Sequence, residues 1–230
     1  VAGIILEVVQ GEGGYVPAPT PFVKELRRIC DEHGIMLIID EVQSGMGRTG
    51  KMFALDHHDG VKADIVCMAK GIGSGMPIGV CTAKAEIMDW HKGAHASTFG
   101  GNPVAIASAL KTIELLENGL VDNARDVGAY LEAGLHKLAE KYDCIGDVRG
   151  LGMMLGVEFV DSKVSKKPAP ELRDRIEMAC FNRGLIILGC GTSTIRWSPP
   201  CLVASPAPRS SPRRSCSTWR TSSPTCSSAT

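Results

Sequence analysis

The feature that most constrains the fold is a series of short, unbroken apolar runs separated by a helix-like segment or by loops. The runs span residues 2–9, 35–39, 63–69 and 78–83. Uninterrupted apolar strands are typical of parallel sheets that are covered on both faces. With a helix predicted over 21–33 between the first two runs, the pattern indicates an α/β fold with a mostly parallel central sheet.

The pattern changes near residue 105, where long helical segments replace the apolar runs. The elements predicted after this point are helices at 103–117 and 121–142, strands near 144–149 and 153–160, a helix at about 171–183 and a strand at 185–188. We therefore expect a large domain over 1–105, followed by a smaller α+β domain over 106–200 that begins with a long connecting helix.

The last thirty residues, 201–230, differ from the rest in composition. Ser, Pro, Arg and Thr predominate there, and Asp, Glu and Lys do not occur. Without an apolar period the segment is not expected to form a packed core. We interpret the abrupt change as a frameshifted sequence, and the alternative is a natural disordered tail.

Composition excludes several classes of function. The 25 Lys and Arg residues balance 25 Asp and Glu residues, which argues against a nucleic acid partner. No apolar run approaches the ~20 residues that a membrane span requires. The nine cysteines form no CxxC pair. Scattered cysteines and the lack of a recognisable signal peptide favour a reducing compartment, so we expect a cytoplasmic protein. The chain begins with Val1 inside a strand pattern, so we expect that an N-terminal part is missing.

Two ionisable residues, Asp40 and Lys70, follow directly after apolar runs. In an open parallel sheet, ligands bind at the carboxyl ends of the strands. Lysine is rarely buried without a function, and the small Ala and Gly neighbours of Lys70 leave room for a planar ligand. A lysine in such a place can form Schiff bases. The alternatives are a capping carboxylate for Asp40 and a surface lysine for Lys70.

Two other patterns are weaker. The stretch 71–75 has the spacing GxGxG rather than the GxGxxG of dinucleotide loops, and Pro77 prevents a helix from starting there. We therefore do not assign a nicotinamide cofactor. The stretch His57-His58-Asp59 could suggest a metal site, but we interpret it as a solvated loop and assign no metal.

Five motifs, in order along the chain, closely resemble those of class III pyridoxal-phosphate-dependent aminotransferases of the 4-aminobutyrate, acetylornithine and ornithine type. The motifs are LIIDEVQSGMGRTGKMFA, ADIVCMAKGIGSGMPIG, HASTFGGNPVA, VRGLGMMLGVEF and IRWSPP. The resemblance covers residues 1–200 and implies the aspartate-aminotransferase-like fold, fold type I, with pyridoxal 5'-phosphate as cofactor. Family members are about twice as long, so the chain resembles their C-terminal half.

The resemblance assigns cofactor-binding roles to five residues. Lys70 matches the catalytic lysine that holds the cofactor and later moves a proton. Asp40 matches the aspartate that pairs with the pyridine nitrogen and so keeps the ring an electron sink. Val42 matches the residue that packs on one ring face, and Gln43 the residue that contacts the ring hydroxyl. Thr98 matches a threonine that binds the cofactor phosphate of the neighbouring subunit, which implies a homodimer with shared active sites.

The resemblance also suggests how the substrate is held. Arg196 matches an arginine that binds a substrate carboxylate through two parallel hydrogen bonds. Glu12 matches a glutamate that pairs with this arginine in several members, so the pair could act as a switch between substrates. Plainer alternatives are a solvated carboxylate for Glu12, a core valine for Val42 and a capping hydroxyl for Thr98.

The expected function is transamination of an ω-amino acid, most like 4-aminobutyrate, with 2-oxoglutarate as the amino acceptor. An amino-acid racemase of the same family is an alternative, because residues 188–191 before Arg196 resemble a branch in which both activities occur. An inactive fragment is the other alternative, because the half that carries the phosphate cradle and the ring-stacking aromatic residue is absent.

Overall fold

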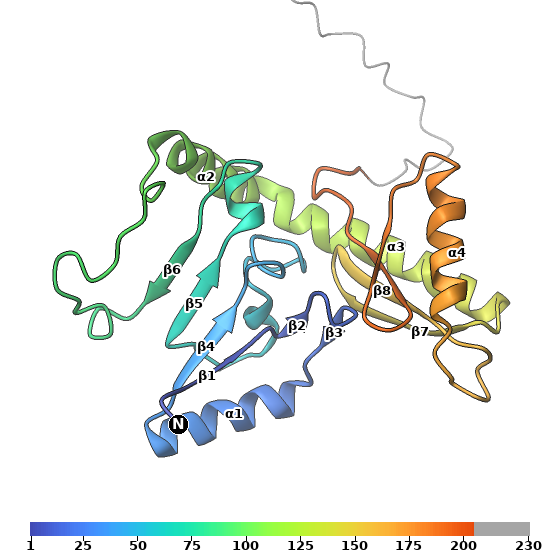
Figure 1. The fold of residues 1–230 in the computed structure, drawn as a ribbon, viewed down its shortest axis with the longest axis horizontal. Coiled ribbons are helices and arrows are strands. Elements are labelled where there is room, and N and C mark those ends of the chain that lie inside the picture. The colour runs from blue at the N-terminus through green and yellow to red at the C-terminus, as the bar shows by residue number, and fades with distance from the viewer. Residues whose placement is uncertain (205–230) are drawn as a thin grey trace, which may run out of the picture.

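The computed structural model describes residues 1–204, and the expected tail lies for the most part outside them. Its first sheet has four strands in the order β1-β4-β5-β6 (Figure 1). They are β1 (Gly3–Leu6), β4 (Met36–Asp40), β5 (Ile65–Met68) and β6 (Val80–Ala83). Strands β1, β4 and β5 run parallel, and β6 runs antiparallel to β5. The prediction of an α/β fold with a mostly parallel sheet is confirmed.

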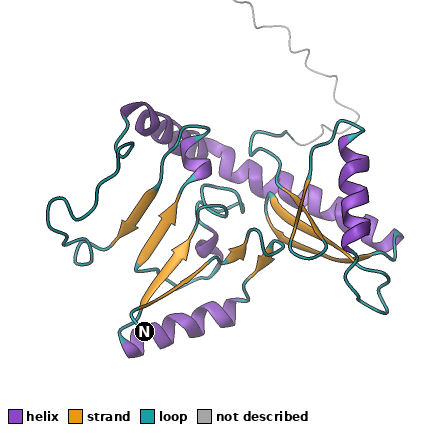
Figure 2. Cartoon of the chain, viewed as in Figure 1, coloured by secondary structure: helices purple, strands orange, loops and turns teal. Residues whose placement is uncertain are grey.

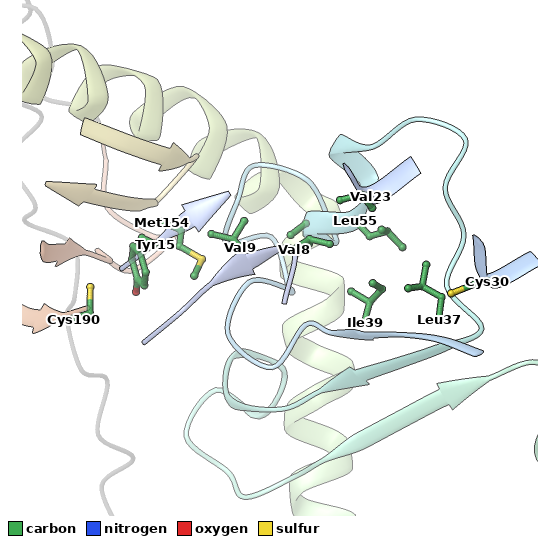
Figure 3. Packing of buried hydrophobic residues seen from close by; sticks show 11 residues of the cluster. Val8, Val9, Tyr15, Val23, Cys30, Leu37, Ile39, Leu55, Met154 and Cys190 are labelled. Atoms are coloured by element: carbon green, nitrogen blue, oxygen red, sulfur yellow. The ribbon is translucent and has the colours of Figure 1, made fainter. Parts of the chain in front are cut away.

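Helix α1 (Thr20–His33) connects β1 to β4 and covers one face of the sheet. Pro21 lies in its first turn, and Gly34 ends it with φ 64°, the left-handed conformation that glycine adopts most readily. The helix buries Val23 and Cys30 against Leu37 of β4 (Figure 3). The end signals in the sequence therefore predicted the helix bounds within one residue.

The first apolar run is not one strand. Strand β1 ends at Leu6, and β2 (Val9–Gln10) pairs antiparallel with β3 (Val16–Pro17). The expectation that this run is covered on both faces was wrong, because the side chain of Ile5 is 63% exposed. Val8 and Val9, beyond the break, are fully buried in a cluster that also takes in Met154 from the second sheet (Figure 3).

The second sheet is antiparallel, with the strand order β7-β8-β10-β9. Its strands are β7 (Ile145–Leu151), β8 (Met154–Phe159), β9 (Leu188–Cys190) and β10 (Thr194–Trp197). The strand predicted at 185–188 begins three residues later than expected, and β10 was not predicted. The pattern there is short and interrupted by Gly191, which has φ 54° in the turn between β9 and β10.

A long helical segment joins the two sheets (Figure 2). It consists of α2 (Pro103–Leu115), a kinked turn over Leu116–Leu120 and α3 (Val121–Lys141). Gly119 has φ 116° in the kink, and Asn102 caps α2 by accepting hydrogen bonds from two backbone N–H groups. Both helices were predicted within two residues at each end. Helix α4 (Pro170–Phe181) packs on the second sheet.

None of the helices in residues 1–204 combines the length and the apolar character that crossing a bilayer requires. Residues 205–230, which carry most of the predicted tail, lie outside the described part.

Candidate active site

The two ionisable residues that follow apolar runs lie at the same edge of the first sheet. Asp40 is the last residue of β4 and is in register with Cys67 of the neighbouring parallel strand β5. Lys70 begins a 3-10 turn (Lys70–Gly73) two residues after β5 ends. The structure thus places a carboxylate and an amine at the carboxyl ends of adjacent strands, where open α/β sheets bind ligands.

The backbone at Lys70 adopts an uncommon conformation. Its φ is 47°, in the left-handed region that residues other than glycine rarely occupy. The turn is held from α2, because the Ser108 hydroxyl donates to the carbonyl of Gly73 at 2.8 Å. The Lys70 side chain is exposed, while Ile72 in the same turn is buried. Left-handed backbone conformations of residues other than glycine cluster at functional sites.

The loop after β4 fixes the Asp40 carboxylate. The backbone N–H of Val42 donates to Asp40 Oδ1 at 2.9 Å. The next side chain, Gln43, packs so close to Gly11 that a Cβ atom there would lie 2.8 Å from the Gln43 amide. Within the described residues, Gln43 Oε1 is buried and accepts no hydrogen bond.

Glu41 is a buried residue that the sequence analysis did not single out. It is 1% exposed and accepts hydrogen bonds from the N–H groups of Ala54 (3.1 Å) and Leu55 (2.8 Å) and from the Ser44 hydroxyl (2.8 Å). Burial raises the pKa of this carboxyl above its usual value. The sequence did carry a signal for Glu41, because it directly follows Asp40 at the end of a strand. Neighbouring side chains of a strand point to opposite sides, so one of two consecutive acidic residues is expected to face the interior.

Glu12 and Arg196 come from different sheets and meet at the same place. Glu12 lies in the turn after β2, and the guanidinium of Arg196 on β10 donates to its carboxylate. This hydrogen bond and the charge of Arg196 lower the pKa of Glu12, and the charge of Lys70 acts in the same direction. The three charged groups therefore share one electrostatic environment.

A cavity of about 290 Å³ lies between Lys70 and Arg196. Lys70, Gln43 and Arg196 line it, together with Leu188 of the segment 188–191 and with Tyr15, which was not predicted from the sequence. Tyr15 is 2% exposed, and its buried ring lies beside Met154 of the second sheet (Figure 3). Tyr15 was missed because it reaches the cavity from the turn between β2 and β3, which carries no chemical motif.

Arg48 also lines this cavity, and its guanidinium donates to the carbonyl of Pro199, so it ties the loop after β4 to the segment after β10. Val42 is half-buried beside Asp40. Thr98 lies in an exposed loop before α2 and is not among the lining residues. Of the seven predicted residues, Lys70, Gln43 and Arg196 line the cavity, and Glu12 pairs with Arg196. Asp40 and Val42 lie at the end of β4 outside the lining, and Thr98 stands apart within one chain.

The interpretation of the two histidines as part of a solvated loop was wrong. His58 is 5% exposed, and its Nδ1 lies 3.1 Å from the Thr20 hydroxyl. His57 Nε2 lies 3.2 Å from Thr49, and burial lowers the pKa of both imidazoles. Among residues 1–204, no cluster of metal-ligating side chains occurs.

The residues at this edge of the first sheet fit pyridoxal phosphate. Asp40 supplies an anion for a protonated ring nitrogen, Lys70 supplies a primary amine for the aldehyde, and the unpartnered Gln43 Oε1 can accept a hydrogen bond from a ring hydroxyl. A buried acceptor without a donor costs free energy, which a hydroxyl at this place would recover.

Comparisons with known proteins agree with this fit. The family model "Aminotransferase class-III" matches residues 1–207. Similar relatives include the 4-aminobutyrate aminotransferase GabT of Escherichia coli, 44% identical over 83% of this chain and 45% of the relative. They also include a leucine/methionine racemase of Thermococcus litoralis, 42% identical over 88% of this chain and 46% of that protein.

The fold matches solved transaminases as well. An amine transaminase from an uncultivated Pseudomonas species, solved in its pyridoxal-phosphate-bound form, superimposes with a TM-score of 0.82 at 36% identity, over 89% of this chain and 48% of that one. The chain spans about half the length of the curated relatives it matches. By sequence, fold and the residues at its cavity, the chain belongs to the class-III aminotransferases, whose cofactor is pyridoxal phosphate.

Proposed function

We propose that the chain forms the C-terminal part of an enzyme that transfers the amino group of an ω-amino acid, most like 4-aminobutyrate, to 2-oxoglutarate. The observation that carries the proposal is the Glu12–Arg196 pair at the cavity that Lys70 lines. The similarity to a 4-aminobutyrate aminotransferase supports the substrate class.

Bound pyridoxal phosphate would supply a protonated ring that takes up electron density from the substrate Cα. Asp40 would hold the proton on the ring nitrogen, and Gln43 would accept a hydrogen bond from the ring hydroxyl. Val42 would pack on one ring face. Lys70 lies just after the carboxyl end of β5, where ligands of such sheets bind. Its Nζ would take the proton from the substrate Cα and deliver it to the cofactor carbon C4′.

The Glu12–Arg196 pair would let one cavity accept two substrates. An ω-amino acid has no carboxylate beside its amine, so Arg196 stays paired with Glu12. Glutamate and 2-oxoglutarate carry an α-carboxylate, which competes for the same guanidinium. Glu12 can leave at low cost because its side chain is 74% exposed, whereas that of Arg196 is 20% exposed and stays in place.

The expected organisation of the protein is also part of the proposal. The large domain would cover residues 1–105 and the small domain 106–200. The exposed position of Thr98 supports a role at the cofactor phosphate of a second subunit, and hence a homodimer. The free thiols among the described residues are compatible with the cytoplasm that we expect.

Half-reactions of the complete enzyme test the proposal. Arg196→Lys keeps the charge but loses the two-pronged hydrogen bond, so the 2-oxoglutarate half-reaction should slow most. Glu12→Ala should shift the preference toward α-amino acids, because an unpaired guanidinium in a partly dry cavity favours any carboxylate that reaches it. The exposed Arg125→Lys is the control. Equal effects on both half-reactions would show that the pair is structural.

A racemase is the second candidate, and the similarity to the Thermococcus litoralis enzyme favours it. A racemase needs no keto acid. Exchange of the α-hydrogen with loss of optical activity, in the absence of 2-oxoglutarate, would support racemisation, whereas strict dependence on 2-oxoglutarate supports transamination. The chain alone, mixed with pyridoxal phosphate, tests the inactive-fragment alternative: an enzyme-like absorbance band would contradict it.

A further inference from the structure

Two arginines flank one glycine on the same face of the second sheet. Gly156 of β8 pairs with Arg149 of β7 on one side and with Arg196 of β10 on the other. Directly opposed residues of antiparallel strands lie on the same face of the sheet. The row Arg149, Gly156, Arg196 therefore forms a notch, with a long cationic side chain on each side of a residue that has none.

The turn that carries Glu12 lies in this notch. A Cβ atom at position 156 would lie 3.0 Å from the carbonyl oxygen of Gly14 and 3.2 Å from the Cβ atom of Tyr15. These distances are shorter than ordinary van der Waals contacts, so a side chain at position 156 would push the turn away. The turn can lie this close to the sheet because residue 156 is glycine. At one side of the notch, Arg196 binds the Glu12 carboxylate.

Arg149 holds the other side of the turn. Its Nε donates to the carbonyl of Gly14 at 3.0 Å, and its Nη2 donates to the buried Thr194 hydroxyl at 3.0 Å. Its Nη1 donates to Asp147 and Glu158 on the sheet, which orient the guanidinium. The Arg149 side chain is only 16% exposed. It thus links the backbone two residues after Glu12 to a rigid part of the sheet.

The main chain of Glu12 is also anchored. The N–H of Gly191 donates to the Glu12 carbonyl at 2.8 Å. A Cβ atom at Gly191 would lie 2.9 Å from the carbonyl oxygen of Gly13, so this contact too depends on a glycine. These contacts anchor the backbone on both sides of Glu12, so the proposed exchange between Arg196 and solvent involves its side chain.

We propose that Arg149 and Gly156 are positioning residues that hold Glu12 opposite Arg196 and so set the preference between substrates with and without an α-carboxylate. The inference rests on the proposed function, because it concerns the substrate-binding pair of that site. Arg149 does not line the cavity beside Lys70. It therefore acts on the substrate through the turn, not by contact.

L-glutamate and 4-aminobutyrate differ only in the α-carboxylate, so single-turnover rates with these two donors measure the preference. In the complete enzyme, Arg149→Met and Gly156→Ala should raise the glutamate-to-4-aminobutyrate rate ratio by about tenfold, in the same direction as the change expected for Glu12→Ala. Arg149→Lys should change it less, because lysine keeps the charge and one donor. The matched control is Gly134→Ala, where an added Cβ atom meets no neighbour within 4 Å.

The double variant Glu12→Ala/Arg149→Met separates positioning from general damage. If Arg149 acts through Glu12, the ratio in the double variant equals that of Glu12→Ala alone. An unchanged ratio with both rates lowered equally, or multiplied effects in the double variant, would overturn the proposal.

Hydrogen–deuterium exchange tests the positioning claim without turnover. Arg149→Met and Gly156→Ala should increase deuterium uptake in residues 11–15, and Gly134→Ala should not. Uptake at the wild-type level in both variants would contradict the proposal that Arg149 and Gly156 hold the turn in place. If the wild-type enzyme uses neither donor, the proposed function fails, and exchange alone decides whether Arg149 and Gly156 position the turn.

Discussion

At the scale of single residues, the proposed chemistry depends first on the charge of Asp40. Asp40→Asn should lower the transamination rate by about 10²–10³-fold, because a neutral amide cannot hold a pyridine nitrogen protonated. The Asn side-chain oxygen can still accept from the Val42 N–H, so the loop should keep its structure. Single-turnover kinetics and cofactor titration measure the two effects.

Cofactor affinity should fall less than turnover in Asp40→Asn. The matched control is Asp126→Asn, whose carboxylate is 67% exposed on α3. Turnover near the wild-type value in Asp40→Asn would refute the assigned role.

Glu41 tests a structural role next to the proposed site. Glu41→Gln should destabilise the protein by roughly 1–3 kcal/mol, because the amide turns an NH₂ group toward backbone donors that need an acceptor. Urea unfolding measures this loss. Glu32→Gln, an exposed change on α1, should have little effect. Unchanged stability in Glu41→Gln would mean that the loop does not depend on this carboxylate.

The pH dependence of the Glu41→Gln effect follows from the raised pKa of Glu41. The folded protein binds this proton more tightly than the unfolded chain does. The stability that Glu41 contributes is therefore fully present below its ordinary pKa and declines as the pH rises through the raised value. The difference in unfolding free energy between wild type and Glu41→Gln should shrink from pH 4 to pH 8, and a difference that grows would contradict the sign.

At the scale of elements, helix α3, the β7–β8 turn and the loop after β4 pack closely where their residues are glycines. A Cβ atom at Gly128 of α3 would lie 2.3 Å from the backbone of Gly152, and one at Gly152 would lie 2.4 Å from that of Thr49. Helix α3, the β7–β8 turn and the loop after β4 therefore stack backbone on backbone. The N–H of Met153 adds a hydrogen bond to the carbonyl of Arg48 at 3.0 Å.

Gly128→Ala should destabilise the protein by about 1–3 kcal/mol, because the helix must move away from Gly152. On the same helix, Gly134→Ala meets no neighbour within 4 Å and should add stability of about 0.5–1 kcal/mol from helix propensity. Urea unfolding of the two variants compares them directly. Equal stability changes would show that the contact at Gly128 is not tight.

At the scale of the whole molecule, the apolar runs predicted where β4 and β5 end, whereas the pairing of distant segments depends on tertiary contacts. Asp40 and Lys70 could be placed at one sheet edge from the sequence, because parallel strands end on the same side. Glu12 and Arg196 are separated by 184 residues, so only the family resemblance suggested that they pair. The positioning role of Arg149 could not be found from the sequence, because Gly14 and Thr194, which it binds, are distant along the chain.

The misplacement of the last strands has the same origin. Strand β9 is three residues long and β10 four, which is too short for alternation to be read reliably. The buried side chain of Ile195 and the pairing of β10 with β8 hold it in the sheet. Burial of Tyr15 likewise depends on the second sheet and leaves no local signal.

Lys70→Ala in the complete enzyme should abolish turnover, while the cofactor still binds without a covalent bond. The result is expected because Lys70 provides the amine at the strand end. The control is Lys84→Ala, which removes an exposed lysine just after the end of β6 and should leave turnover unchanged. Turnover retained in Lys70→Ala would remove this lysine from the mechanism.

The most direct test of the account is to locate the covalent attachment of the cofactor. The complete enzyme would be loaded with pyridoxal phosphate, reduced with borohydride, digested and mapped by mass spectrometry. We expect a pyridoxyl group on Lys70, two residues after β5, and an unmodified Lys84 in the same digest. A pyridoxyl group on any other lysine, with Lys70 unmodified, would contradict it.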